Sequence, residues 1–204
     1  MGRATERDLP RIAEIFADAF DESVRHVYGY AARPPAIAEM FRVCLAAEPG
    51  GFFVAREESG LAVGYCFAPR RVSRLWGVFF SRGFIWRWAA KLVSGQLGVG
   101  LAQVRRLLPD KASFLQTALS HRQGGGARIL SVGVSSAAQG RGVGTALLKA
   151  ALGRFDALGE PEVSLEVRPW NEPAVRLYRR HGFVEIGRTR DTQGEWVVMR
   201  RKRP

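Results

Sequence analysis

Apolar residues in the first third of the chain follow a helical spacing first and an alternating spacing afterwards. Asp8-Leu-Pro10 is a typical helix start, because an acidic N-cap and a first-turn proline both suit the unpaired N–H groups found there. The helix that follows is predicted to bury one apolar stripe, made of Ile12, Ile15, Phe16, Ala19 and Phe20. A second helix is expected over 35–46, and two strands over 51–56 and 61–67.

The last third of the chain alternates strands and helices more regularly. Four strands are predicted here, over residues 129–135, 163–168, 183–186 and 195–199. A glycine-rich loop leads from the first of them into an amphipathic helix that ends at Gly159. A second, shorter helix runs from Asn171, a good N-cap residue, to Gly182. This rhythm predicts an α/β fold.

Residues 70–126 interrupt the pattern with aromatic and cationic sequence, and further helices are predicted within them over 101–108 and 112–121. The segment holds ten basic residues and one acid, Asp110, so it carries +9 of the chain's net charge of +12. Such a block favours phosphates, nucleic acid, anionic lipid or another anionic partner, and a solvated surface is the plain alternative. Its aromatic residues suit stacking, an interfacial helix or a small core of their own. We interpret it as an insertion within one domain of residues 1–204.

Composition narrows the class of protein. The chain has 204 residues, of which 47% are hydrophobic and 25% charged, values typical of a globular domain. Cys44 and Cys66 are the only cysteines and both lie in apolar sequence, so we expect no disulfide framework and no metal site. A cytoplasmic location is the simplest expectation. The first residues lack the apolar core of a signal peptide, and no uncharged run is long enough to cross a bilayer.

The loop Gln139-Gly-Arg-Gly-Val-Gly-Thr145 carries the clearest chemical signal. A dinucleotide-binding fingerprint would need a third glycine at Thr145 and a tight turn directly after the strand, and the lysine of a P-loop is absent. A helix N-terminus nevertheless offers unpaired N–H groups and a partial positive charge, and glycines let a diphosphate approach them closely. The loop therefore predicts a phosphate-bearing ligand without naming it.

Two blocks of sequence together resemble the GNAT superfamily of acyl-CoA N-acyltransferases. The first, Val132 to Gly144, is similar to the family's Gln/Arg-x-x-Gly-x-Gly/Ala loop. The second, Leu165 to Phe183, is similar to its Asn-x-x-Ala-x-x-Leu-Tyr-x-x-x-Gly-Phe helix and to members such as ribosomal-protein alanine N-acetyltransferases. The resemblance implies a three-layer α/β/α fold with a mixed central sheet, in which 70–126 is a helical insertion between the third and fourth strands.

The resemblance also assigns roles to residues. Tyr178 falls at the position of the general acid, and Glu166 at that of a base acting through water. The donor would be acetyl-CoA, with no metal. The residues expected to bind it are Val132, Gly133, Val134, Gln139, Gly140, Arg141, Gly142, Val143, Gly144, Thr145, Asn171 and Tyr178. Three acids near the end of the first helix are candidates for attracting an ammonium group: Asp18, Asp21 and Glu22.

Two classes of function remain open at this stage. The first is an enzyme that moves an acetyl group directly to a primary amine of a small molecule or a peptide, in a ternary complex. The second is a non-catalytic module that binds acyl-CoA, or that binds nucleic acid or a membrane through residues 70–126. The acceptor amine, the acyl chain length and the oligomeric state, including a homodimer, are not determined by the sequence.

Overall fold

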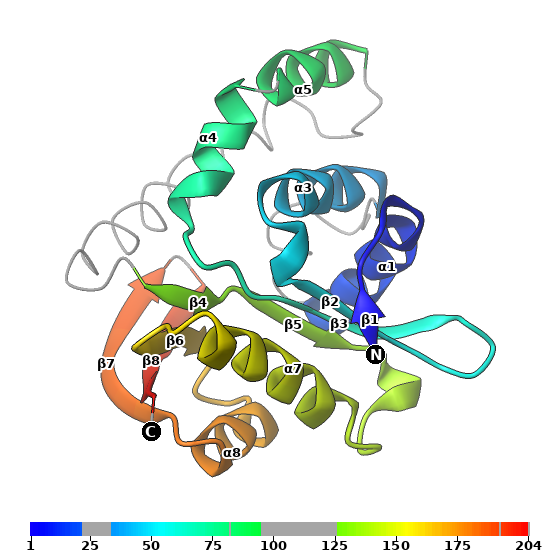
Figure 1. Cartoon of the computed structure of the whole chain (residues 1–204). Coiled ribbons are helices and arrows are strands. Elements are labelled where there is room, and N and C mark those ends of the chain that lie inside the picture. Colours follow the sequence, from blue (N-terminus) through cyan, green and yellow to red (C-terminus); the bar gives the residue numbers. More distant parts are fainter. Residues whose placement is uncertain (22–33, 82, 95–125, 192, 204) are drawn as a thin grey trace.

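The strands form two four-stranded sheets that meet in the middle of the molecule (Figure 1). The computed structural model describes residues 1–21, 34–81, 83–94, 126–191 and 193–203. The first sheet is antiparallel, in the order β1 (Gly2–Arg3), β2 (Phe52–Arg56), β3 (Ala62–Phe67) and β5 (Ser131–Val134). The second is mixed, in the order β4 (Ala127–Ile129), β6 (Glu162–Val167), β8 (Gly194–Lys202) and β7 (Val184–Asp191), with β4 parallel to β6.

The strand predicted over 129–135 is two strands, because the chain changes its partners at Leu130. Before this residue β4 pairs with β6, and after it β5 pairs with β3. The Leu130 N–H donates to the carbonyl oxygen of Phe67 at 2.9 Å, so the chain already follows the first sheet at that point. Local sequence gave no sign of this change, since both halves are equally apolar and strand-like.

Helices cover both faces of the strands, which confirms the predicted α/β fold. On one side lie α1 (Leu9–Ala19) and α3 (Pro34–Ala47), and on the other α7 (Val143–Ala157) and α8 (Glu172–Arg180) (Figure 1). Both β2 and β3 are buried nearly throughout, as strands covered on two faces must be. The Phe41 ring of α3 packs edge-on against Tyr65 of β3, with ring centroids 5.2 Å apart. Short 3-10 turns lie at Glu6–Asp8, Pro49–Gly51 and Ser136–Ala138.

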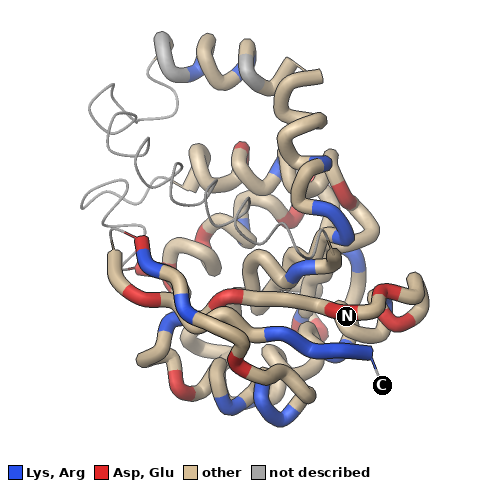
Figure 2. The backbone as a smooth tube through the Cα atoms, turned by 90° about the vertical axis from the view of Figure 1, so that its left-hand side faces the viewer, with Lys and Arg blue, Asp and Glu red and all other residues tan. Residues whose placement is uncertain are grey.

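Part of the predicted insertion forms a helical arm, α4 (Ser73–Ser81) and α5 (Phe84–Val93), which extends beyond α3 in Figure 1. The helices predicted over 101–108 and 112–121 lie outside the described residues. Figure 2 shows that basic residues also line the C-terminal strand, so the positive charge of the described chain is not confined to this arm. Several large apolar side chains of the arm are exposed: Trp76, Phe80 and Trp86.

Basic residues at 70–91 pair with buried acids of the main body. Arg70 contacts Glu160, and Lys91 contacts Glu39. Arg74 lies 3.7 Å from Glu48, which Arg154 of α7 also contacts at 2.5 Å. A buried carboxylate needs such partners because its charge is poorly solvated. Arg74 and Lys91 therefore connect the arm to the body, and Arg70, just before the arm, makes a further contact of this kind.

Replacing Glu39 with glutamine is expected to lower the free energy of unfolding at pH 7 by about 1–3 kcal/mol, through the loss of charged hydrogen bonds. Burial opposes ionisation of Glu39, but hydrogen bonds from Lys91 and Arg42 outweigh it and lower its pKa from the ordinary 4.5. A lowered pKa gives stability that is present above pH 4.5 and is lost as the pH falls through the folded-state value.

Thermal or urea unfolding of the wild type and Glu39→Gln between pH 7 and pH 3 measures this effect. The difference between them should shrink below about pH 4.5. Glu14→Gln is the matched control, because Glu14 makes a similar helical pair with Arg11 but its side chain is 53% exposed. That variant should differ from the wild type by less than about 0.5 kcal/mol. A Glu39→Gln variant as stable as Glu14→Gln would contradict the anchoring role.

Candidate active site

A cavity of about 830 Å³ opens where β5 and β6 diverge. β4 and β6 are paired as far as Ile129 and Leu165. Beyond this pair β5 turns to β3 and β6 stays with β8, so the two strands no longer bond to each other. β5 is thus the last strand of its sheet among the described residues, and Val132 and Val134 line the cavity along it. An edge strand of this kind has backbone N–H and C=O groups free for an extended ligand.

The glycine loop forms one end of the cavity, which is lined by Gln139, Gly140, Gly142, Val143, Gly144 and Thr145. Gly140 and Gly142 have φ of 75° and 78°, a conformation that other residues adopt only with strain. Gly142 is the N-cap of α7 and has no side chain to accept from the first-turn N–H groups. A Cβ at Gly140 or Gly142 would meet nothing within 4 Å. This open cradle of N–H groups fits the diphosphate of coenzyme A.

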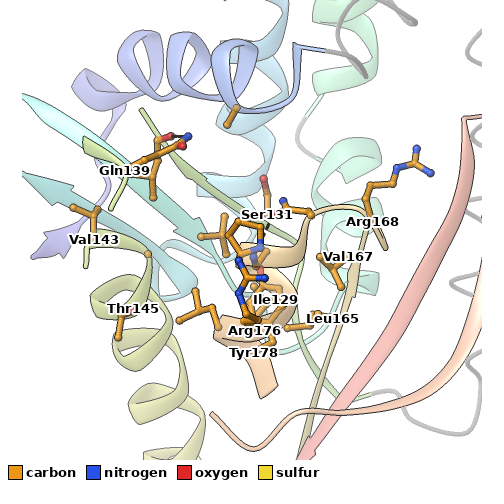
Figure 3. A pocket seen from close by; sticks show the side chains of 18 of the residues that line it. Ile129, Ser131, Gln139, Val143, Thr145, Leu165, Val167, Arg168, Arg176 and Tyr178 are labelled. Atoms are coloured by element: carbon orange, nitrogen blue, oxygen red, sulfur yellow. Dashed lines mark hydrogen bonds between the residues drawn. The ribbon is translucent and has the colours of Figure 1, made fainter. Parts of the chain in front are cut away.

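Helix α8 brings Tyr178 to the same cavity (Figure 3). Asn171, the N-cap residue of this helix, also lines the cavity. The Asn171 side chain accepts a hydrogen bond from the Ala174 N–H at 3.2 Å, so it caps the helix as its sequence predicted. Tyr178 is 8% exposed and packs edge-on against Phe183, with centroids 5.9 Å apart. Burial, with a smaller effect of Cys66, raises the pKa of Tyr178. Its phenol therefore stays protonated at neutral pH.

Glu166 lies at the base of the divergence, one residue beyond the last β4–β6 pair. Its Oε2 is 2.8 Å from the guanidinium of Arg128, and both side chains of this ion pair are mostly buried. Within the described part of the chain, the buried Oε1 of Glu166 has no hydrogen-bond partner, as is also true of one oxygen each of Glu39 and Glu48. Glu166 itself is among the residues that line the cavity.

Several residues chosen from the sequence lie elsewhere. Arg141 is exposed, 3.1 Å from Glu57, and Gly133 is packed against the Tyr65 ring, so neither is among the cavity-lining residues. Asp18 accepts a hydrogen bond from the Ser136 N–H at 2.9 Å and also lies off the lining, whereas Asp21 is part of it. Glu22 lies outside the described residues.

The structure adds lining residues that sequence reasoning missed: Phe20, Ser131, Arg168, Trp170, Arg176, Arg180 and Trp196. Arg168 and Trp170 stand inside the block that carries the family resemblance, but no local pattern marks them as lining residues. Trp196 reaches the cavity from β8, thirty residues beyond Glu166 in sequence. In Figure 3, Gln139, Val143 and Thr145 lie on one side of the cavity, and Leu165, Val167 and Arg168 on the other.

The described residues contain no cluster of three or more His, Cys, Asp or Glu side chains placed to hold a metal ion. Cys66 is buried within the core of the sheet, and burial raises its pKa to about 12. A thiol held neutral in this way is a poor nucleophile. Among the helices of the described part of the chain, none combines the length and the apolar character needed to cross a membrane.

The cavity of this α/β protein is lined by a glycine-rich helix N-terminus, an edge strand and a buried tyrosine. The family model described as "Acetyltransferase (GNAT) family" matches residues 9–183. The chain belongs to this family, as its two motif blocks predicted.

Known proteins similar to this chain are acetyltransferases. It is 44% identical over 61 residues to the mycothiol acetyltransferase of Clavibacter michiganensis and 39% identical over 59 residues to an N-alpha-acetyltransferase of Sulfurisphaera tokodaii. These matches span only 20% and 35% of the two relatives. The solved ribosomal-protein-alanine N-acetyltransferase of Brucella melitensis superposes with a TM-score of 0.60 at 18% identity, covering 98% of both chains. That likeness concerns the fold.

Proposed function

We propose that this protein transfers an acetyl group from acetyl-CoA to a primary amine, with both substrates bound at once. The observation that carries the proposal is the shared cavity: the glycine cradle, the β5 edge, Tyr178 and Glu166 all line one space. The buried, high-pKa Cys66 argues against an acyl-enzyme. Direct attack by the amine is therefore the simpler route.

The glycine loop and α7 hold the donor in this proposal. The first N–H groups of α7 bind the diphosphate, and the free edge of β5 pairs with the pantetheine arm as an added strand. When bound, acetyl-CoA supplies the thioester whose acyl group is transferred. A β5 backbone N–H aimed at the acyl oxygen stabilises the negative charge that develops there, an effect of several kcal/mol in related chemistry.

Two side chains manage the protons. The reaction forms a C–N bond, breaks the C–S bond, removes one proton from the amine and adds one to the departing sulfur. Tyr178 holds a proton at its hydroxyl and donates it to the departing sulfur, and burial, which raises the pKa of Tyr178, keeps the phenol neutral before the transfer. Glu166, which lines the same cavity, accepts the amine proton directly or through one water.

Replacing Glu166 with glutamine is expected to lower kcat/KM by about tenfold near pH 7, since general bases contribute at least this much. The loss should shrink towards about pH 10, where an alkylamine is already largely deprotonated without help. Initial rates of thiol release across this pH range measure the effect. A constant loss at every pH would indicate a structural role for Glu166 beside Arg128 and would remove it as the base.

The proposed function is tested by calorimetric binding of acetyl-CoA, followed by a free-thiol assay with amino sugars, polyamines, arylalkylamines and peptide N-termini. We expect micromolar binding and transfer to at least one amine class. Absence of acetyl-CoA binding would refute the proposal. The alternative of a nucleic-acid-binding module has less support, because Arg70, Arg74 and Lys91 are paired with acids of the main body.

A further inference from the structure

A stack of three flat side chains forms part of the cavity wall at the end of β6. The Arg168 guanidinium carbon lies 3.8 Å from the ring centroid of Trp196 and 5.2 Å from that of Trp170. All three residues line the cavity. Trp196 and Arg168 are mostly covered, whereas Trp170 is 53% exposed and ends the stack. The exposed member of the stack is therefore the indole of Trp170.

Hydrogen bonds to neighbouring residues hold Arg168 and Trp196 of this stack in place. Both terminal nitrogens of Arg168 contact the carboxylate of Asp191, at 3.2 and 3.3 Å. The Trp196 Nε1–H donates to the same carboxylate at 2.7 Å. Gly194 lies beside the Trp170 ring, and a Cβ there would come to 4.0 Å from it. A rigid aromatic surface loses little conformational entropy when a ligand packs on it.

The charge of Arg168 is already paired within the chain. Asp191 neutralises it, and its remaining hydrogen bonds go to the Glu195 carbonyl and the Gln193 side chain. Both terminal nitrogens of this guanidinium are thus already bonded within the chain. What the stack offers is its flat face, which prefers another aromatic ring or an apolar plane.

Glu166 lies on β6, Arg168 is the first residue beyond the end of that strand, and both line the cavity. Two residues of strand span about 6.6 Å. An amine held at Glu166 is therefore separated by only a short linker from a group that rests on the stack. The opposite end of the cavity, at the glycine loop, is the one suited to the donor's phosphates.

We propose that Trp170, held by Arg168 and Trp196, is a binding platform for the aromatic group of the acceptor, and that the acceptor is an arylalkylamine or an amine with a similar short-linked ring. This inference rests on the proposed function, since the amine must reach the same cavity as the donor. Trp170 is then a residue that sets acceptor specificity without touching the atoms that react.

Two amines of equal linker length test the platform: 2-phenylethylamine, which has an aromatic face, and 2-cyclohexylethylamine, which has none. With acetyl-CoA as donor and thiol release as readout, kcat/KM for the aromatic amine should be about threefold to tenfold higher. Trp170→Ala should remove this preference mainly by raising KM, and Trp170→Phe should keep most of it. Trp86→Ala on α5, an exposed tryptophan outside the cavity lining, is the matched control and should change nothing.

Calorimetric binding of each amine to the CoA-saturated protein gives a readout that does not depend on turnover. The affinities should show the same preference for the aromatic amine, and Trp170→Ala should remove it. Equal kcat/KM and affinity for the two amines, or transfer only to amines without an aromatic ring, would overturn the platform and leave the proposed function intact. Failure to bind acetyl-CoA would overturn both. Circular dichroism of Trp170→Ala and Trp170→Phe establishes that any change is not unfolding.

Discussion

Tyr178→Phe is expected to lower kcat by about 100-fold while leaving the affinity for acetyl-CoA nearly unchanged, because loss of a general acid removes at least this much rate. The substitution keeps the ring, its edge-on contact with Phe183 and its place in the core. Only the proton donor is lost, so the departing thiolate must take its proton from water. Steady-state thiol release and calorimetric binding of acetyl-CoA separate the two effects.

Tyr65→Phe is the matched control for this prediction. Tyr65 is also buried, and its hydroxyl bonds to the Ser131 Oγ at 2.7 Å, but it is not among the residues that line the cavity. Its loss should lower stability by about 1 kcal/mol and change kcat little. Because burial raises the pKa of Tyr178, wild-type activity should show no loss from its ionisation up to about pH 10. Equal kcat in the wild type and Tyr178→Phe would exclude Tyr178 as the acid.

The double variant Gly140→Ala/Gly142→Ala is expected to weaken binding of acetyl-CoA by about 100-fold. Each alanine in a left-handed conformation costs about 1–2 kcal/mol, so the loop relaxes away from the geometry of Gly140 and Gly142. The loss of two charged hydrogen bonds from displaced N–H groups accounts for an effect of this size. Calorimetry with acetyl-CoA measures the affinity, and thermal unfolding measures the accompanying loss of stability.

Gly153→Ala provides a control in the same helix. Gly153 lies in α7, a Cβ there would meet nothing within 4 Å, and its φ is not positive. Alanine should therefore stabilise the helix by about 0.5–1 kcal/mol and leave acetyl-CoA binding unchanged. Unchanged affinity in the Gly140/Gly142 double variant would mean that the diphosphate does not lie on this loop.

In the structure, some of the basic residues of 70–126 contact acids of the main body. The sequence of this segment alone favoured an anionic partner, because ten bases face one acid over 70–126. In the described part of 70–126, however, Arg70, Arg74 and Lys91 contact Glu160, Glu48 and Glu39, all buried. The acids that balance these bases stand far away in sequence, so a charge count over one segment could not find them.

The sequence by itself determined the parts of this protein that depend on short stretches of chain. The Asn171 cap, the glycines before α7 and the Leu165–Phe183 block each have a local backbone requirement, and each appears as predicted. Local chemistry of this kind is readable because neighbours in sequence are also neighbours in space. The family followed from two such blocks, and Tyr178 and Glu166 both line the cavity.

Only the tertiary structure decided which distant residues meet. It divided one apparent strand at Leu130 and so opened the cavity, and it placed Arg128 against Glu166. It also stacked Trp196 of β8 on Arg168, which follows β6, although the two residues are far apart in sequence. Strand partners, ion pairs and ring contacts depend on packing between elements, and a periodicity within one element carries no information about its partner.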